Sequence, residues 1–340
     1  MLHTMYERKL LRLEREWQQA LETLCSWAGE VVMGPLLAAG ERWWPGRPAR
    51  LVLAPLGALG IVPWHAARCP APSPATPSVT AVYACQRAAV SSCATARQLI
   101  EVAARPRAVP AAGKVAVVAD PGGTPAMHRE AALVGSLYPG SVVIGGLGDR
   151  APAGGPEPLP AVPASLAPFL PGRGPVPTAV LHVNCHADTG RTPADSVLEL
   201  DAAHRVSVTD LLAGAAGRDP SVPGGTVVLA NCTSDLALSD HDEALTLATA
   251  FLGAGATAVV GSRWDVADDP RTTLLMLVFH HRLSRGEPAG EALRAAQRWM
   301  LDPERVLPPE LAPHEPLLRA TAGRPLDELE VWAAFAHHGR

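Results

Sequence analysis

The sequence lacks the long apolar segments that membrane proteins need. No apolar run approaches the roughly 18 consecutive residues that span a bilayer. Residues 1–17, MLHTMYERKLLRLEREW, carry too many charges to form the apolar core of a secretory signal peptide. We therefore expect a cytoplasmic protein that does not bind a membrane.

Clusters of positive charge are also missing. Lys and Arg number 29 against 33 Asp and Glu, the formal net charge is −4, and aromatic residues make up 4% of the chain. The basic residues are scattered and form no stripe interleaved with aromatic residues, which is the pattern typical of nucleic-acid binding. Nucleic acid is therefore not an expected partner.

The cysteines are not arranged in the closely spaced pairs of zinc sites or of small disulfide-bonded domains. The six are Cys25, Cys69, Cys85, Cys93, Cys185 and Cys232. In a reducing compartment most of them are expected to be small buried apolar residues. No G-x-G-x-x-G or P-loop motif follows an expected strand, so nucleotide chemistry is not favoured. We expect neither a metal ion nor a cofactor.

Apolar residues, in contrast, make up 48% of the 340 positions, enough for a sizeable core. Short apolar, β-branched runs lie at 51–53, 115–118, 142–144, 180–183, 227–229 and 258–260. Helical patterns lie between several of them, at 129–137, 243–252, 272–283 and 290–301. This alternation predicts an α/β fold with a largely parallel sheet covered on both faces. The stretch 150–177, rich in Pro, Gly and Ala, is expected to be an exposed connection or a pair of loosely packed segments rather than a regular element.

The N-terminal segment has the periodicity of a helix. Between Tyr6 and Val32 apolar residues recur every three or four positions with Glu and Arg among them, and Gly34-Pro35 is expected to interrupt the helix. Two roles are open for this amphipathic helix. It packs on the domain that follows, or it provides a docking surface for a partner.

Two of the expected buried strands end in a group that is nucleophilic or basic. The segment VLHVNCHADTG places His186 just past Val183, whereas His182 lies inside the strand and is expected to be a buried, hydrogen-bonded structural residue. The segment TVVLANCTSD places Cys232 just past Ala230. If these strands are neighbours, the imidazole and the thiol stand at one edge of the sheet, as a cysteine hydrolase requires. The alternative is that the cysteine fills the core and the histidine is structural.

Several segments, in their order along the chain, resemble the motifs of the CHAT peptidases, relatives of caspases and separases that often occur joined to tetratricopeptide repeats. LHVNCHADTG (181–190) resembles the family's histidine motif, and ANCTSD (230–235) resembles its nucleophile motif. DEALTLATAFLGAGATAVVGSRWDVAD (242–268) is the most specific stretch. The opening LVLAPLGALGIVPWHAA (51–67), the segment VYACQRAAV (82–90) and the closing WAAFAHHG (332–339) extend the resemblance over nearly the whole chain from about residue 20.

We expect the amphipathic N-terminal helix to occupy residues 1–45. Over residues 46–340 the resemblance implies a caspase-like three-layer α/β sandwich with a mostly parallel central sheet and helices on both faces. It implies a cysteine endopeptidase with Cys232 as nucleophile and His186 as general base. The backbone amides of Ala187 and Cys232 would hold the developing oxyanion. The chain departs from the family pattern at Ala187, where Gly is usual, and at Ser234, where Thr is usual. Alanine still donates the amide unless the backbone there requires a positive φ.

Substrate specificity is suggested by the segment GSRWDVAD, which resembles a separase segment that contributes to binding a basic P1 side chain. The resemblance implies that Asp265 pairs with Arg or Lys in a desolvated pocket, and Asp235 is expected to reinforce it. Two alternatives stay open. Both acids are solvated loop residues, or Arg263 points into the same pocket and neutralises the charge.

The expected partners are a protein or peptide substrate and a regulatory protein. CHAT relatives are commonly fused to repeat domains that sense a signal, and we expect residues 5–33 to dock a separate regulator in this chain. The rival hypothesis is a catalytically inactive member of the same family that acts as a scaffold or regulatory binding module.

Overall fold

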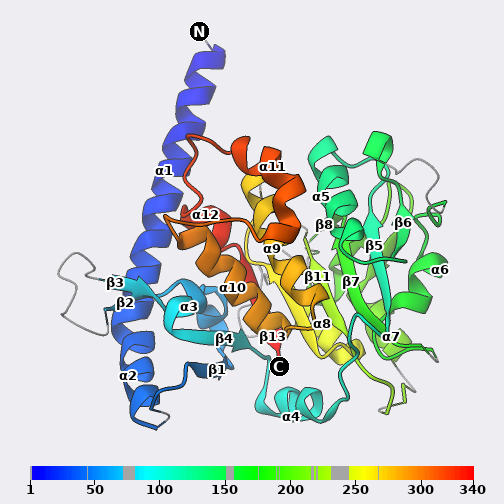
Figure 1. Ribbon diagram of the computed structural model, residues 1–340, viewed down its shortest axis with the longest axis horizontal. Coiled ribbons are helices and arrows are strands. Elements are labelled where there is room, and N and C mark those ends of the chain that lie inside the picture. Colours follow the sequence, from blue (N-terminus) through cyan, green and yellow to red (C-terminus); the bar gives the residue numbers. More distant parts are fainter. Residues whose placement is uncertain are drawn as a thin grey trace.

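The computed structural model describes residues 2–43, 45–71, 81–150, 157–174, 176–188, 190, 192–215, 218–219, 221–230, 245–266 and 268–340. The long helix α1 (Leu2–Ala28) lies along one side of the molecule, and its N-terminal end extends beyond the rest of the chain (Figure 1). The remaining elements gather around a central sheet.

The central sheet has eight strands in the order β1-β4-β13-β12-β11-β7-β5-β6. Neighbouring strands are parallel except for β12 and β13, so the strands on the two sides of that pair run in opposite directions. The bounds are β1 Ala49–Leu53, β4 Ala88–Ser92, β5 Lys114–Ala119, β6 Val142–Gly145, β7 Thr178–Asn184, β11 Thr226–Leu229, β12 Ala258–Ser262 and β13 Phe335–Gly339.

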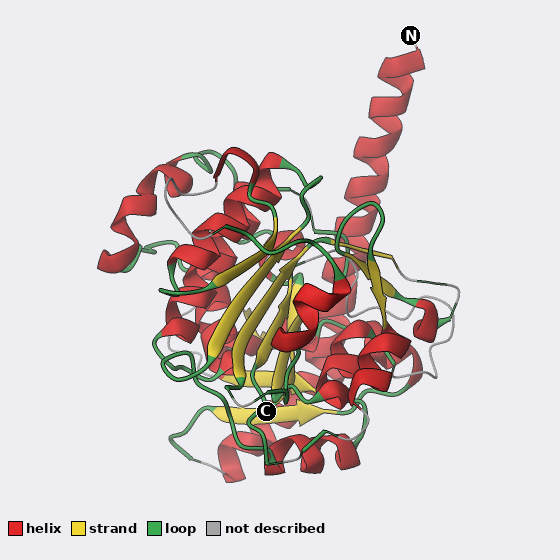
Figure 2. Ribbon diagram, turned by 90° about the vertical axis from the view of Figure 1, so that its right-hand side faces the viewer, coloured by secondary structure: helices red, strands yellow, loops and turns green. Residues whose placement is uncertain are grey.

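Helices cover both faces of the sheet (Figure 2). One buried apolar cluster joins alternate sheet residues to α5 (Pro125–Ser136), α9 (Pro270–Ser284) and α10 (Ala289–Leu301). A second cluster joins the intervening residues to α4 (Ala96–Ala104), α6 (Pro163–Leu166), α7 (Val208–Ala215) and α8 (Leu247–Ala254). Successive residues of a strand point to opposite faces, and Val180 and Leu181 of β7 accordingly belong to different clusters.

The smaller elements lie at the margins of the sheet. β8 (His186–Asp188), β9 (Val197–Glu199) and β10 (Arg205–Ser207) form a three-stranded antiparallel sheet, and β2 (Arg68–Pro70) pairs with β3 (Ala81–Tyr83). The short helices are α2 Gly34–Trp43, α3 Ala84–Arg87, α11 Glu315–Arg319 and α12 Leu329–Trp332.

Local sequence determines where helices begin and end. Thr124 and Asp269 accept backbone hydrogen bonds at the starts of α5 and α9, and a proline follows each of these caps. Gly255 ends α8 with φ of +124°, and a Cβ at this position would lie 2.8 Å from the Pro171 carbonyl oxygen. Glycine is the residue that fits this turn without strain.

The expected α/β sandwich with a mostly parallel sheet is confirmed. Each of the six apolar runs identified in the sequence lies in a strand, and the four adjacent strands β5, β7, β11 and β12 are buried along nearly all of their length. Helices occupy the predicted ranges, with α8 described from Leu247 onward.

Two expectations about the chain were wrong. The N-terminal helix is not interrupted at Gly34-Pro35: it passes through a π-helical stretch, Gly29–Met33, and continues as α2. Pro35 has no amide to donate to the preceding turn, and the helix widens directly before it, where the Gly34 amide donates to the Gly29 carbonyl five residues back. The stretch 150–177 does contain a regular element, the short helix α6, and it is packed rather than exposed there, because Leu166 and Phe169 are buried against the sheet.

Candidate active site

The carboxyl ends of two adjacent strands meet at the predicted site. β7 and β11 are parallel neighbours with Val183 opposite Leu229. The backbone amide of Ala230 donates to the Val183 carbonyl at 2.9 Å, so the ends of both strands are fixed to one another. His186 follows β7 by two residues, and Cys232 follows Ala230 by two residues. The carboxyl ends of these two strands, after which the two predicted residues follow in the sequence, therefore lie at the same edge of the sheet.

His186 is the first residue of β8, and its side chain is exposed. β8 pairs with β9 in antiparallel fashion, with His186 opposite Glu199 and Ala187 opposite Leu198. Cys185, directly before His186, is buried. Ala187 thus lies in extended backbone, which alanine adopts without strain, and its difference from the family glycine imposes no conformational cost.

A pocket of about 250 Å³ opens at this edge. Its lining includes His186, which follows β7, and Ala230, which follows β11. Glu130 of α5 contributes one acidic wall, and Asp268 and Asp269 contribute another. None of the described residues that line the pocket is Lys or Arg. The pocket is suited to a polar or cationic group.

The predicted nucleophile Cys232 and the predicted acid Asp235 lie outside the described residues. The other five cysteines are free and buried. Burial raises the pKa of each of these thiols, to about 12 for Cys25 and Cys85, which disfavours the reactive thiolate. The same holds for Cys185, although it adjoins His186. None of the five described thiols is suited to act as the nucleophile.

Asp265 and Arg263 are placed on either side of Trp264, in the segment after β12. Asp265 is exposed, and among the described residues it is Asp268, three positions further on, that lines the pocket. The Arg263 guanidinium donates to the carbonyl of Gly60, and Arg263 is not among the described residues lining the pocket. Its expected alternative role in neutralising the pocket charge therefore has no support, while the role of Asp265 stays a prediction.

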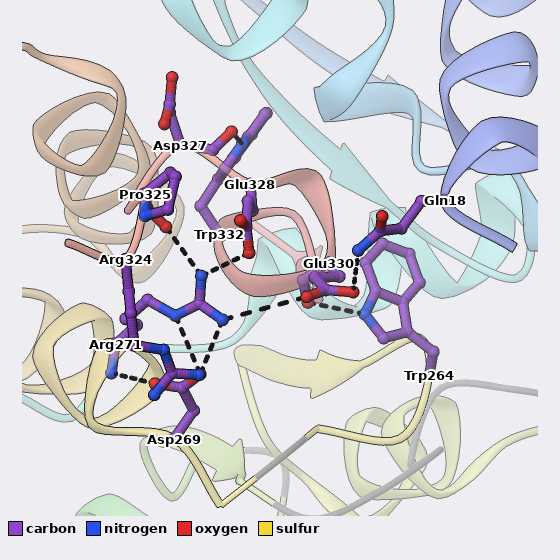
Figure 3. Close-up of polar contacts among 10 residues, drawn as sticks. All are labelled: Gln18, Trp264, Asp269, Arg271, Arg324, Pro325, Asp327, Glu328, Glu330 and Trp332. Carbon is purple, nitrogen blue, oxygen red and sulfur yellow. Dashed lines mark hydrogen bonds and ion pairs between the residues drawn. The ribbon is translucent and has the colours of Figure 1, made fainter. Parts of the chain in front are cut away.

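Asp269 is attached to two arginines (Figure 3). Its Oδ2 lies 2.9 Å from Nε of Arg271 and 2.6 Å from Nη2 of Arg324. Burial alone would raise the pKa of Asp269, but the Arg271 hydrogen bonds and the nearby Arg324 outweigh burial and lower it. The charge of Asp269 is thus compensated within the protein, and the residue fixes the pocket wall at the start of α9.

The same network reaches helix α1 (Figure 3). Arg271 lies 4.0 Å from the Glu330 carboxylate, which accepts a hydrogen bond from Gln18 of α1 at 3.0 Å. The Trp264 indole donates to the Glu330 carbonyl at 2.9 Å and packs edge-on against Trp17 of α1, with ring centroids 5.5 Å apart. A continuous set of contacts therefore joins Gln18 of α1, through Glu330 and Arg271, to Asp269 in the wall of the pocket.

Glu130 and Asn184 are pocket residues that sequence reasoning missed. Asn184 ends β7, and its side-chain amide lies 3.3 Å from the Glu130 carboxylate. A glutamate within a regular helical pattern is typical of a solvated face, so nothing in the sequence distinguished Glu130. A polar residue at the end of an apolar strand was the signal that could have identified Asn184.

The described part of the chain contains neither a metal-binding cluster nor a membrane-spanning helix. There, no group of three or more His, Cys, Asp and Glu side chains is arranged to hold a metal ion. The described helices include none that is sufficiently long and apolar to cross a bilayer.

Comparison with known proteins gives a family match. The CHAT domain matches residues 22–340. None of the curated proteins compared matches the chain. A solved structure described as "Structure of Protease" is similar at 9% sequence identity with a TM-score of 0.41, covering 75% of this chain and 55% of that one. Because the family match extends over most of the sequence, the chain belongs to the CHAT domain family.

Proposed function

We propose that the chain is a cysteine endopeptidase that hydrolyses peptide bonds through Cys232 and His186. The observation that carries the proposal is the pocket at the shared edge of β7 and β11, whose lining includes His186 and Ala230, two residues before Cys232. Membership of the CHAT domain family supports it. So does the burial of the five described cysteines, because it leaves Cys232 as the remaining candidate nucleophile.

The proposed reaction forms and then hydrolyses an acyl-enzyme. The Cys232 thiolate attacks the scissile carbonyl carbon, and the oxyanion is held by the amides of Ala187 and Cys232. The C–N bond then breaks as the His186 imidazolium gives its proton to the leaving amine. His186 next takes a proton from water, which attacks the thioester and releases the acid. The thiol is regenerated, and the chemistry requires neither a metal ion nor a cofactor.

A preference for a basic P1 side chain is a second part of the proposal. Asp265 and Asp235 are its proposed carboxylates on the basis of sequence, and the acidic lining of the pocket supports the same charge preference. Asp268 lines the pocket directly and is the alternative partner for the basic group.

Control by a regulatory protein is proposed for helix α1, within residues 5–33. Within residues 5–33, Leu13, Trp17 and Trp27 of α1 and Val31 of the π-helical stretch Gly29–Met33 are at least 40% exposed, which supports a docking surface. We place the enzyme in the cytoplasm, because the five described cysteines are free, as is usual in a reducing compartment.

The test is labelling of Cys232 with a cysteine-directed electrophile in the native protein, followed by peptide mapping. Rapid labelling is expected, with a large loss of rate in His186→Ala, because the imidazole no longer stabilises the thiolate. Peptide hydrolysis is expected to disappear in both Cys232→Ala and His186→Ala without loss of the fold. The matched control is His204→Ala, a partly exposed histidine at the turn between β9 and β10.

Two results would contradict the proposal. Turnover retained in either dyad variant removes the assignment of that residue. A Cys232 that does not react in the folded wild-type protein favours the rival function, a scaffold or regulatory module that has the same fold without the chemistry.

A further inference from the structure

A chain of buried polar side chains lies directly behind the pocket. It begins at Tyr138, just past the end of α5, and continues through His280 of α9 and His182 of β7. It ends at Glu130 of α5 and at Asn184, the last residue of β7. All five are buried, in a region where these elements otherwise pack through apolar residues. Buried polar groups are costly unless they find partners, so their mutual contacts indicate a specific arrangement.

Successive polar contacts link Tyr138, at one end, to the Glu130 carboxylate at the other. The Tyr138 hydroxyl lies 2.9 Å from His280 Nδ1, and His280 Nε2 lies 3.1 Å from His182 Nδ1. His182 Nε2 lies 3.5 Å from Glu130 Oε1. Burial, and then the neighbouring His182, hold the pKa of His280 well below its usual value, so this imidazole is neutral. His182 Nε2 has no hydrogen bond to the described residues, and the Glu130 carboxylate lies within ion-pair range of it, so an N–H at this nitrogen faces a carboxylate oxygen.

The chain ends on the hydrogen bonds that attach the last residue of β7. Asn184 Nδ2 donates to Glu130 Oε1 at 3.3 Å and to the Met127 carbonyl at 3.2 Å. Both acceptors belong to α5, so the Asn184 side chain fastens the carboxyl end of β7 to that helix. Two residues later, His186 opens β8 at the pocket. The path by which the chain leaves β7 therefore depends on this attachment.

We propose that Glu130 is a positioning residue for His186, because it holds Asn184 and with it the turn that delivers the imidazole to the pocket. The proposal rests on the peptidase function proposed above, since it adds Glu130 to the machinery of that site. Glu130 acts through Asn184 and touches no reacting atom. The polar chain behind it fixes the carboxylate in the orientation that accepts the amide.

The test exchanges the hydrogen-bond donor Asn184 and the acceptor Glu130 in two steps. Asn184→Asp sets two carboxylates against each other, and kcat is expected to fall by about tenfold or more while KM stays within about threefold. In the double variant Asn184→Asp with Glu130→Gln, the introduced amide donates to the introduced carboxylate, and most of the lost kcat is expected to return. Glu130→Gln alone keeps an acceptor oxygen for Asn184 and is expected to lose less than Asn184→Asp.

A second readout does not depend on activity. The ring resonances of His186, followed by NMR in protein with labelled histidine, are expected to shift in Asn184→Asp and to return in the double variant at an unchanged Tm. If the wild type does not hydrolyse peptides, the peptidase proposal fails. The spectra still show whether Glu130 and Asn184 position His186, because they do not depend on activity.

Two outcomes overturn the positioning role. One is a double variant that resembles Asn184→Asp in both kcat and the His186 spectrum. The second outcome concerns the case in which Asn184→Asp does not fold. Asn184→Ala then replaces it, because it removes the donor without adding a charge. A folded Asn184→Ala variant with the wild-type His186 spectrum overturns the proposal.

Discussion

At the scale of single residues, the acidic groups around the pocket differ in how their charge is balanced. Asp269 is buried and paired with Arg271 and Arg324, so little of its charge is left for a ligand. Asp265 and Asp268 are exposed, and of these two Asp268 lines the pocket. The sequence pattern therefore indicates Asp265 as the partner for a basic P1 side chain, whereas the pocket geometry indicates Asp268.

Paired substitutions distinguish these two carboxylates. If Asp265 binds P1, Asp265→Ala is expected to lower kcat/KM for Arg-containing peptides by about thirtyfold or more, because losing one partner of a desolvated charge pair costs about 2–5 kcal/mol. Asp265→Asn is expected to do nearly as much, since it keeps the shape and removes the charge. Asp268→Asn serves as the matched variant at the pocket.

Measured kcat/KM on peptides that differ only at P1 decides the question. A large loss in Asp268→Asn alone transfers the role to the residue that lines the pocket. A wild type that prefers Asp or an apolar residue at P1 ends the proposal of basic specificity altogether.

At the scale of elements, the strands that carry the site were predicted better than the residues that support it. β7 and β11 appear in the sequence as apolar runs, with His182 as the one polar residue inside the run of β7, because both of their faces are buried. β4 and β13 were missed because they contain Ser and His. The structure shows why these strands tolerate polar residues: Ser91 Oγ lies 2.7 Å from His337 Nδ1 across the pair. A hydrophobicity pattern does not identify such strands, because the partners that allow their polar residues to be buried are distant in the sequence.

The same limit applies to the site. His186 was located from its place after a strand, and the residues that approach it from other elements were not. Glu130 is 54 residues from Asn184 in the chain, and only the packing of α5 on β7 brings them together. A local sequence pattern predicts which residues follow the end of a strand. The contacts between elements that are distant in the sequence are known only from the structure.

Helix α1 is the element through which a regulator is proposed to act. Trp17 and Trp27 both lie on α1 and are equally exposed, but Trp17 packs on Trp264 beside the pocket wall whereas Trp27 packs on Trp64. Trp17→Ala is expected to change kcat/KM severalfold, because an aromatic pair contributes about 0.5–1.5 kcal/mol and its loss frees the segment that carries Trp264.

Trp27→Ala is the matched control for the basal rate, with kcat/KM of the purified chain expected to stay close to the wild-type value when no regulator is present. The measurement is peptide hydrolysis by the purified chain, with and without the candidate regulator. Equal effects of the two substitutions would remove the link between α1 and the pocket, and full activity that no α1 substitution alters would count against regulation through this helix.

At the scale of the whole molecule, stability depends on imidazoles that remain neutral in the core. Burial lowers the pKa of His337 to about 3, with smaller contributions from His338 and Arg50. Burial also holds the pKa of His280 well below its usual value. In the unfolded chain both groups titrate near their ordinary pKa of about 6.5. Below that pH the unfolded state binds protons that the native state does not, so the native state loses stability as the pH falls from about 6.5 toward 3.

Each such histidine is expected to reduce the free energy of unfolding by at most about 1.4 kcal/mol per pH unit in this window, or roughly 2 kcal/mol between pH 7 and pH 5. His337→Asn removes one of the two groups and keeps a polar partner for Ser91. Urea unfolding at pH 5, 6 and 7 is therefore expected to show a smaller loss for the variant than for the wild type, by about 2 kcal/mol over this range. A variant whose stability falls as steeply as that of the wild type would show that His337 is protonated in the native core, and that the acid sensitivity of the fold arises elsewhere.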